Sequence, residues 1–163
     1  MANLRGVATA LILLAGGAAA PSPAAPEQPV LERLPADTIS FEISSWGYPM
    51  ESFRITSDGN GEYSKAPEFR APVQTRRFNA GAGGFTHIRA LLARIEHFAA
   101  HAPDCGNRAT DLPYGQIVWQ AAAARAVIGF DVGCQSEEMQ SVVNAAHDAA
   151  GLAEHFSQTH AAQ

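Results

Sequence analysis

The chain lacks the short motifs that identify the common enzyme classes. It has no Gly-x-Ser-x-Gly elbow for a nucleophilic serine, no His-Glu-x-x-His zinc motif and no Cys-x-x-Cys pair for redox work. The sequence therefore predicts no catalytic residue and no cofactor. We expect a binding module rather than an enzyme.

Basic residues are also scarce, and Lys65 is the only lysine. Loss of Arg5 with an export signal would leave 10 of the 11 basic residues against 16 acidic ones, a formal net charge of −6 instead of −5. An acidic chain is repelled by a phosphate backbone. We therefore expect no nucleic acid among the partners.

The N-terminus has the layout of a secretory signal peptide. A positive charge at Arg5 precedes an apolar run over residues 7–15 and a stretch of small residues before Pro21. We place cleavage after Ala19, so that residues 1–19 are removed. The apolar run is about half of the ~20 residues that a membrane-spanning helix needs, so we expect no stable membrane insertion afterwards. The mature protein is expected in the periplasm or outside the cell.

The remainder divides into a linker, one domain and a short tail. Residues 20–37 are rich in proline and alanine, which favours an extended, solvated linker. Residues 38–157 have the length of a single α+β domain with one core. Residues 158–163 are expected to form a flexible tail.

Alternation of polar and apolar residues predicts an antiparallel sheet of five to six strands in this domain. The cluster Ser57–Gly61 predicts a tight turn within it. The predicted strands are residues 38–44, 52–56, 62–64, 73–78, 116–120 and 126–132.

Two segments carry apolar residues at helical spacing. The first follows Gly81–Gly84, has Thr86 as its expected N-cap and ends at Pro103. The second begins after Ser136 as its N-cap, with acidic residues in its first turn. Because each helix has a single apolar stripe, we predict an α+β fold in which both helices pack on one face of the sheet.

Two cysteines in an exported chain are expected to pair. Cys105 follows the first predicted helix, and Cys134 precedes the second. Closing a loop of about 30 residues stabilises a fold by roughly 3 to 4 kcal/mol in the chain-entropy model. We therefore predict a structural disulfide, with a redox or metal role as the alternative.

One pair of histidines has a spacing that suits a metal ion. His97 and His101 stand four residues apart on the first predicted helix, and Asp104 is the nearest candidate for a third ligand. The alternative is two solvent-facing histidines that gain from the helix dipole when charged. A small metal-dependent or hydrolytic enzyme built on these residues is an alternative function.

The turn between the first two predicted strands is unusually apolar. Trp46, Tyr48, Pro49 and Met50 occupy a position where solvent normally selects small polar residues. An exposed patch of this kind marks a contact surface, and the alternative is that Trp46 and Met50 fold back onto the core. The leading hypothesis is a non-enzymatic module that contacts an envelope or periplasmic protein through this turn. An inhibitor or immunity-type protein would show the same pattern.

Three arginines form a further candidate site. Arg70, Arg76 and Arg77 precede Gly81–Gly84, whose backbone amides at the start of a helix favour an anion. The alternative is solvated charges along an edge strand.

The predicted opening hairpin contains Trp46-Gly47-x-Pro49, Phe53-x-Ile55 and Asp58-Gly59. In these motifs it resembles a family of bacterial exported small domains of unknown function. The resemblance implies an exported domain, and it implies no activity.

Overall fold

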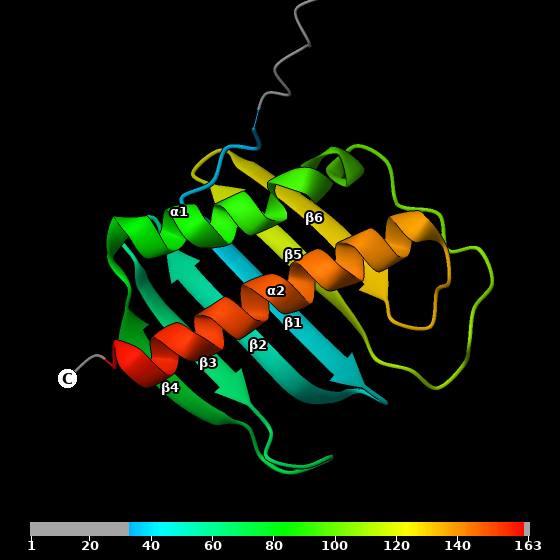
Figure 1. The fold of residues 1–163 in the computed structure, drawn as a ribbon, viewed down its shortest axis with the longest axis horizontal. Helices are drawn as coiled ribbons and strands as arrows, with labels where there is room; N and C mark the ends of the chain where they lie inside the picture. The colour runs from blue at the N-terminus through cyan, green and yellow to red at the C-terminus, as the bar shows by residue number, and fades with distance from the viewer. Residues whose placement is uncertain (1–32, 162–163) are drawn as a thin grey trace, which may run out of the picture. The chain divides into compact units, whose positions relative to one another are not determined.

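Six antiparallel strands form the sheet of the protein in a computed structural model that describes residues 33–161. The strand order is β4-β3-β2-β1-β5-β6, so β4 and β6 are the two edges (Figure 1). The strands are β1 Thr38–Ser45, β2 Tyr48–Thr56, β3 Asn60–Lys65, β4 Gln74–Asn79, β5 Tyr114–Ala121 and β6 Ala124–Asp131. The predicted antiparallel sheet is confirmed.

One face of the sheet is apolar because alternate residues of each strand point to the same side. Ile39, Phe41 and Ile43 of β1 are all buried. The Phe41 ring lies 5.6 Å from that of Phe53 and 5.9 Å from that of Phe130, measured between centroids. These contacts join β2, β1 and β6 into one core.

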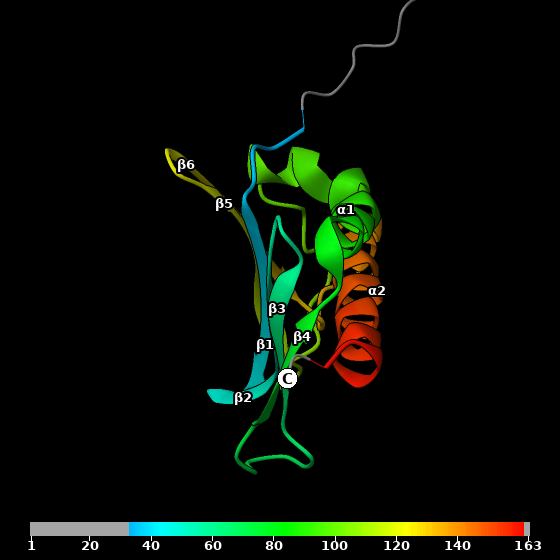
Figure 2. The ribbon, with the colours of Figure 1, turned by 90° about the vertical axis from the view of Figure 1, so that its left-hand side faces the viewer.

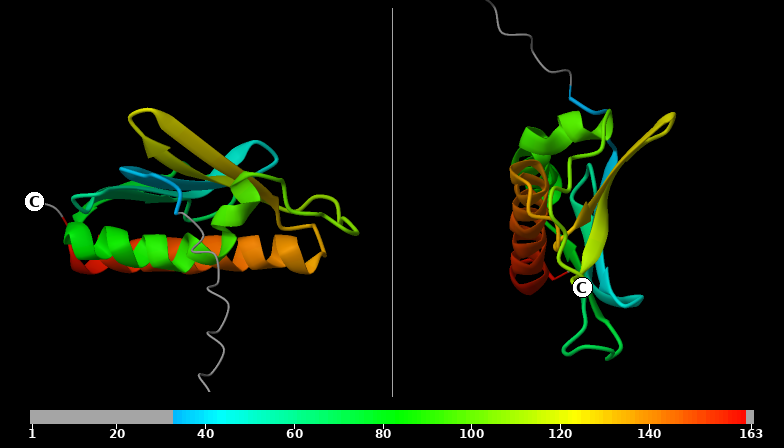
Figure 3. Two further views of the ribbon diagram at one scale, coloured as in Figure 1. Left: turned by 90° about the horizontal axis from the view of Figure 1, so that it is seen from above. Right: turned by 90° about the vertical axis from the view of Figure 1, so that its right-hand side faces the viewer.

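Two helical segments cover this apolar face. The helix α1 Gly81–Leu92 continues into the 3-10 helix η1 Ala93–Ala99, and α2 Glu137–Thr159 follows the sheet. Both lie on the same side of the sheet, next to each other (Figures 2 and 3). The predicted α+β fold, with two helices packed on one face, is confirmed.

The second helix agrees with its prediction. Ser136 is the N-cap, and its side chain accepts a hydrogen bond from the Met139 amide. Seven apolar residues that lie at helical spacing along it are all buried: Met139, Val142, Val143, Ala146, Ala150, Ala153 and Phe156.

The predicted start of the first helix is wrong. The helix begins at Gly81 and not after Thr86, whose hydroxyl donates to the Ala82 carbonyl from inside the helix. The Asn79 side chain accepts a hydrogen bond from the Gly81 amide at 2.9 Å and so takes the part of a cap. At Gly84 a Cβ would lie 2.3 Å from the Cβ of Ala80, so glycine permits this tight helix start.

The same helix also ends earlier than predicted. The chain tightens into the 3-10 helix η1 after Leu92, so His97 is not on an α-helix. Residues three apart share a face in a 3-10 helix, and Ile95 and Phe98 are accordingly both buried. The buried Glu96 carboxylate accepts a hydrogen bond from the Leu34 amide at 3.0 Å.

Both ends of the described chain are attached to the sheet. The Asp37 amide donates to the Gln120 carbonyl at 2.7 Å, and the Asn79 amide donates to the His160 carbonyl at 3.0 Å. Residues 33–37 of the expected linker and residues 158–161 of the expected tail therefore contact the domain. The expected signal peptide and residues 20–32 lie outside the described residues. Among residues 33–161, no helix is long and apolar enough to cross a membrane.

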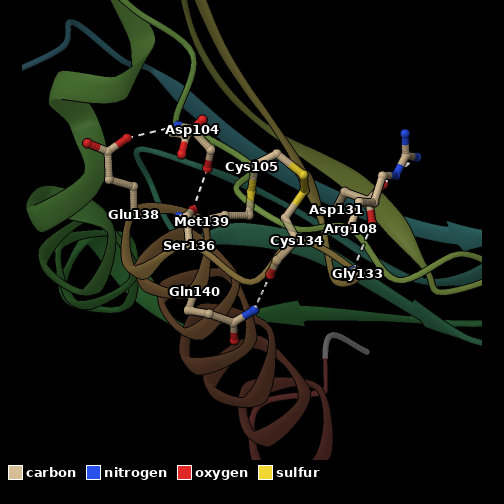
Figure 4. The surroundings of a disulfide bond; sticks show 10 residues. All are labelled: Asp104, Cys105, Arg108, Asp131, Gly133, Cys134, Ser136, Glu138, Met139 and Gln140. Carbon is tan, nitrogen blue, oxygen red and sulfur yellow. Dashed lines mark hydrogen bonds and ion pairs between the residues drawn. A yellow bond between two sulfur atoms is a disulfide. The ribbon is translucent and has the colours of Figure 1, made fainter.

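The predicted disulfide between Cys105 and Cys134 is confirmed (Figure 4). It joins the loop before β5 to the segment before α2. Hydrogen bonds surround it, because the Cys105 carbonyl accepts from the Gln135 amide at 3.1 Å, and the Gln140 side chain donates to the Cys134 carbonyl at 2.6 Å. The bridge thereby fixes the start of α2 against the long loop.

Candidate binding site at the Trp46 end of the sheet

The turn between β1 and β2 has a strained backbone. Ser45 pairs with Tyr48, so Trp46 and Gly47 form a two-residue turn. Their φ angles are 53° and 78°, both in the left-handed region. Such a turn favours Asn or Asp followed by Gly, and a bulky residue is rare there. Placing an ordinary L-residue in this conformation costs roughly 1–2 kcal/mol.

Burial does not compensate for this cost. The Trp46 side chain is 64% exposed, and Tyr48 is 40% exposed. Within residues 33–161, neither side chain makes a hydrogen bond. The Trp46 side chain therefore contributes little to the stability of the fold.

Met50 behaves differently from Trp46. A β-bulge shifts the pairing between Ile43 and Ser44, and the shift leaves Met50 without an opposite residue on β1. Bulges change the direction of side chains, and Met50 packs against the core. The structural alternative that the sequence left open thus applies to Met50, whereas Trp46 points into solvent.

Aromatic and cationic side chains stack beside this turn. The Phe69 ring, from the loop between β3 and β4, meets Tyr48 edge-on with centroids 5.7 Å apart. The Arg70 guanidinium lies 5.0 Å from the Tyr48 centroid and 5.2 Å from that of Phe69. These distances are those of cation–π contacts.

All exposed large hydrophobic side chains of residues 33–161 come from one end of the sheet. In an antiparallel sheet, the end of β1 adjoins the starts of β2 and β5, the end of β3 and the start of β4. We call this group the aromatic end; its members are Trp46, Tyr48, Phe69, Val73, Leu112 and Tyr114. An exposed hydrophobic patch marks an interaction site.

An apolar pocket opens beside the aromatic end. Its volume is about 360 Å³, and Met50, Pro49, Phe69, Pro113 and Val132 supply apolar walls. This volume lies in the range of small-ligand pockets, roughly 300–1,000 Å³. The pocket is large enough for one or two apolar side chains of a partner.

Polar groups also line this pocket, namely Glu51, Lys65, Glu68 and His147. The Tyr63 hydroxyl donates to Glu51 at 2.6 Å. Burial raises the pKa of Tyr63 well above its ordinary value, and the neighbouring Glu51 carboxylate adds to the shift. Tyr63 therefore remains a neutral donor that holds the Glu51 carboxylate in place.

The structure brings His97 and His101 near each other, with ring centroids 6.0 Å apart, and both are exposed. The backbone of Asp104 is attached to the start of α2, because its amide donates to the Glu138 side chain and its carbonyl accepts from the Ser136 hydroxyl (Figure 4). In the part of the chain that is described, no three His, Cys, Asp or Glu residues are grouped for a metal ion.

The three arginines of the anion hypothesis have separate surroundings. Arg70 stacks on the aromatic end, and Arg77 forms an ion pair with Glu62 at 2.9 Å. Arg76 lines a different cavity, beside Glu154 of α2. Gly81–Gly84 forms the first turn of α1 rather than a loop.

Sequence reasoning identified Trp46 and Tyr48 but missed Phe69, Leu112 and Tyr114. These residues are far from the turn in the sequence, and only the strand order brings them to the same end of the sheet. The one local signal in the sequence was Phe69, an aromatic residue that lies between two charged residues in a proline-containing segment. No protein-family model matches the chain, and no curated protein matches it.

Proposed function

We propose that this chain is an exported, non-enzymatic binding module whose aromatic end contacts a protein of the periplasm or cell envelope. One observation carries the proposal: Trp46 occupies a left-handed turn position that disfavours it, and yet its side chain is 64% exposed. A strained residue that the fold does not need points to a function. Asparagine at this position would relieve the strain and would be more soluble.

The composition of the aromatic end supports a protein partner. Tryptophan, tyrosine and arginine are the residues that dominate binding energy in protein interfaces. Trp46, Tyr48 and Arg70 present all three within one surface. The apolar pocket beside them offers a recess for a side chain of the partner, and Glu51 supplies a fixed hydrogen-bond acceptor at its wall.

The N-terminal sequence and the disulfide support the proposed cellular location. The expected signal peptide would direct the chain out of the cytoplasm. Disulfides persist in oxidising compartments, and Cys105–Cys134 is such a bond. The partner is therefore sought in the periplasm or envelope.

Affinity capture from an envelope extract tests this proposal with matched variants. Trp46→Asn removes the aromatic ring and suits the turn, while Trp46→Phe keeps a ring at the same position. Ala123→Asn changes an exposed residue in the two-residue turn between β5 and β6. A partner that wild type, Trp46→Phe and Ala123→Asn retain, and that Trp46→Asn loses, supports the proposal. Equal capture by all four proteins would overturn it.

A further inference from the structure

The apolar pocket beside the aromatic end has more acidic than basic residues in its wall. Glu51 and Glu68 both line it, and Lys65 is the only lysine or arginine among the described residues that do so. His147 is the remaining titratable residue of the wall. Glu68 is exposed, whereas Glu51 is half-buried. The Glu51 carboxylate is therefore the charged group of the pocket that is partly withdrawn from water.

Lys65 does not neutralise Glu51, although the two residues lie opposite each other in the β2–β3 register. Opposite charges in such a position normally attract each other. The Lys65 ammonium pairs instead with the Glu154 carboxylate of α2 at 3.1 Å, and Glu154 lines the neighbouring cavity rather than this pocket. Among residues 33–161, no lysine or arginine forms an ion pair with Glu51. The carboxylate is thus left for a cation from outside the fold.

The Tyr63 hydroxyl restricts which cation suits this carboxylate. It donates to Oε1 of Glu51 at 2.6 Å, so Oε2 is the oxygen left for a ligand. A guanidinium binds a carboxylate best through both oxygens, whereas an ammonium is a compact charge that can use one. The geometry at Glu51 favours lysine over arginine.

We propose that this pocket receives a lysine side chain of the protein that the aromatic end contacts. The lysine stem packs against the apolar walls formed by Met50, Pro113 and Val132. Its ammonium pairs with the Glu51 carboxylate. Because Lys65 is the only lysine of the chain and already belongs to the wall, the lysine comes from a different protein. This inference rests on the proposed function, to which it adds the residue that the partner presents.

An NMR titration of the isotope-labelled mature protein with two matched probes tests the pocket. Nα-acetyl-lysine methylamide carries the stem and the ammonium, and Nα-acetyl-norleucine methylamide carries an equal number of side-chain carbons without the charge. The dissociation constant of the lysine probe should be about fivefold lower than that of the norleucine probe. Its binding should shift amide signals of the wall, namely those of Met50, Glu51, Ala66 and Val132. Equal affinities, or no shift of these amides by the lysine probe, would overturn the inference.

Two charge-removing variants locate the effect. Glu51→Gln keeps an acceptor for the Tyr63 hydroxyl, and it should abolish the preference for the lysine probe without changing the affinity for norleucine. Glu42→Gln removes the same charge beside a different cavity, on the face of the sheet away from the helices, and should leave both affinities unchanged. A preference that persists in Glu51→Gln, or that both variants remove equally, would contradict a lysine site at Glu51.

The choice of lysine over arginine has its own test. Wild type should bind the lysine probe more tightly than Nα-acetyl-arginine methylamide. Tyr63→Phe frees Oε1 of Glu51 and should reverse this order, because the guanidinium can then use both oxygens. A wild-type preference for arginine, or an unchanged order in Tyr63→Phe, would overturn the assignment of lysine. If Tyr63→Phe does not fold, the wild-type comparison decides alone.

Failure of this inference is distinguishable from failure of the proposed function. Affinity capture with Trp46→Asn tests the aromatic end, and capture with Glu51→Gln tests the pocket. Loss of the same partner by both variants supports both conclusions. A partner that Trp46→Asn loses and Glu51→Gln retains would overturn the lysine inference and leave the proposed function standing. A partner that both variants retain would contradict both.

Discussion

The two turns at the ends of β2 both contain a glycine at positive φ, but their other side chains differ in whether they contact the fold. The Ser57–Gly59 turn has Gly59 at φ 88°, and the Trp46–Gly47 turn has Gly47 at φ 78°. Around Gly59, however, the polar side chains of Thr56, Asp58 and Asn60 are hydrogen-bonded within the turn. Beside Gly47, the large Trp46 side chain points into solvent.

A network of hydrogen bonds closes the turn at Gly59. Asp58 accepts from the Thr56 hydroxyl at 2.5 Å and from the Asn60 side chain at 2.7 Å. The Asn79 side chain donates to Asn60 at 2.8 Å, and the Ala80 amide donates to the Gly59 carbonyl at 3.0 Å. This turn thereby attaches the β2–β3 hairpin to the start of α1.

This difference distinguishes a residue that stabilises the fold from a residue whose presence the fold does not explain. Asp58 is where turn chemistry would place it, and its bonds explain its presence. Trp46 is where turn chemistry would not place it, and no bond or burial explains it. The contrast is the physical basis of the proposed function.

The largest contrast is expected from alanine at the two glycines. Gly59→Ala should lower the free energy of unfolding by at least about 3 kcal/mol, because left-handed strain adds to a clash. The new Cβ would lie 2.2 Å from the Gly81 carbonyl oxygen. In Gly47→Ala the new Cβ would meet no atom within 4 Å. This variant should lose only about 1 kcal/mol of the free energy of unfolding. Urea denaturation of both variants measures the difference, and equal losses would contradict it.

A smaller effect of opposite sign is expected at Trp46. Trp46→Asn should raise the free energy of unfolding by about 1 kcal/mol, since asparagine before glycine suits a turn with two positive φ angles. Trp46→Phe retains the unfavourable backbone and should show no gain. Denaturant unfolding of the two variants beside wild type provides the measurement. A loss of stability in Trp46→Asn would mean that the tryptophan packs against the fold after all.

The smallest effect is a dependence of the Asp58 turn on pH. Hydrogen bonds from the Thr56 side chain, then from the Asn60 amide and side chain, lower the pKa of Asp58 below its ordinary value of 3.8. The charged form therefore stabilises the folded state above that value, and this contribution is lost as pH falls through the lower, folded-state pKa. The melting temperatures of wild type and Asp58→Asn should differ at pH 7, and the difference should shrink as the pH falls below 3.8. A constant difference down to pH 2 would refute the assignment.

Local patterns were sufficient for most of the fold. Alternation predicted the strand over residues 38–44, in which Ile39, Phe41 and Ile43 are buried. Ser136 was identifiable as a cap from its position before two acids. These features depend on residues close together in sequence. The cysteine pair was predictable because only two cysteines exist.

Features that depend on distant contacts were not predictable. The change from α1 to η1 places Glu96 where it accepts from Leu34, a residue 62 positions away. Phe69 and Tyr114 lie in the candidate site only because the strand order brings their segments to the same end of the sheet. The left-handed φ of Trp46 was also hidden, because a Trp-Gly pair is not a usual sequence for this turn.

Site-specific photo-crosslinking in cells that export the protein tests the contact surface most directly. A photoreactive aromatic residue would replace Trp46 in one protein and Ala123, in the turn at the opposite end of the sheet, in another. The account predicts one defined adduct from position 46 with a periplasmic or envelope protein and none from position 123. No adduct at position 46, or the same adducts from both positions, would contradict it.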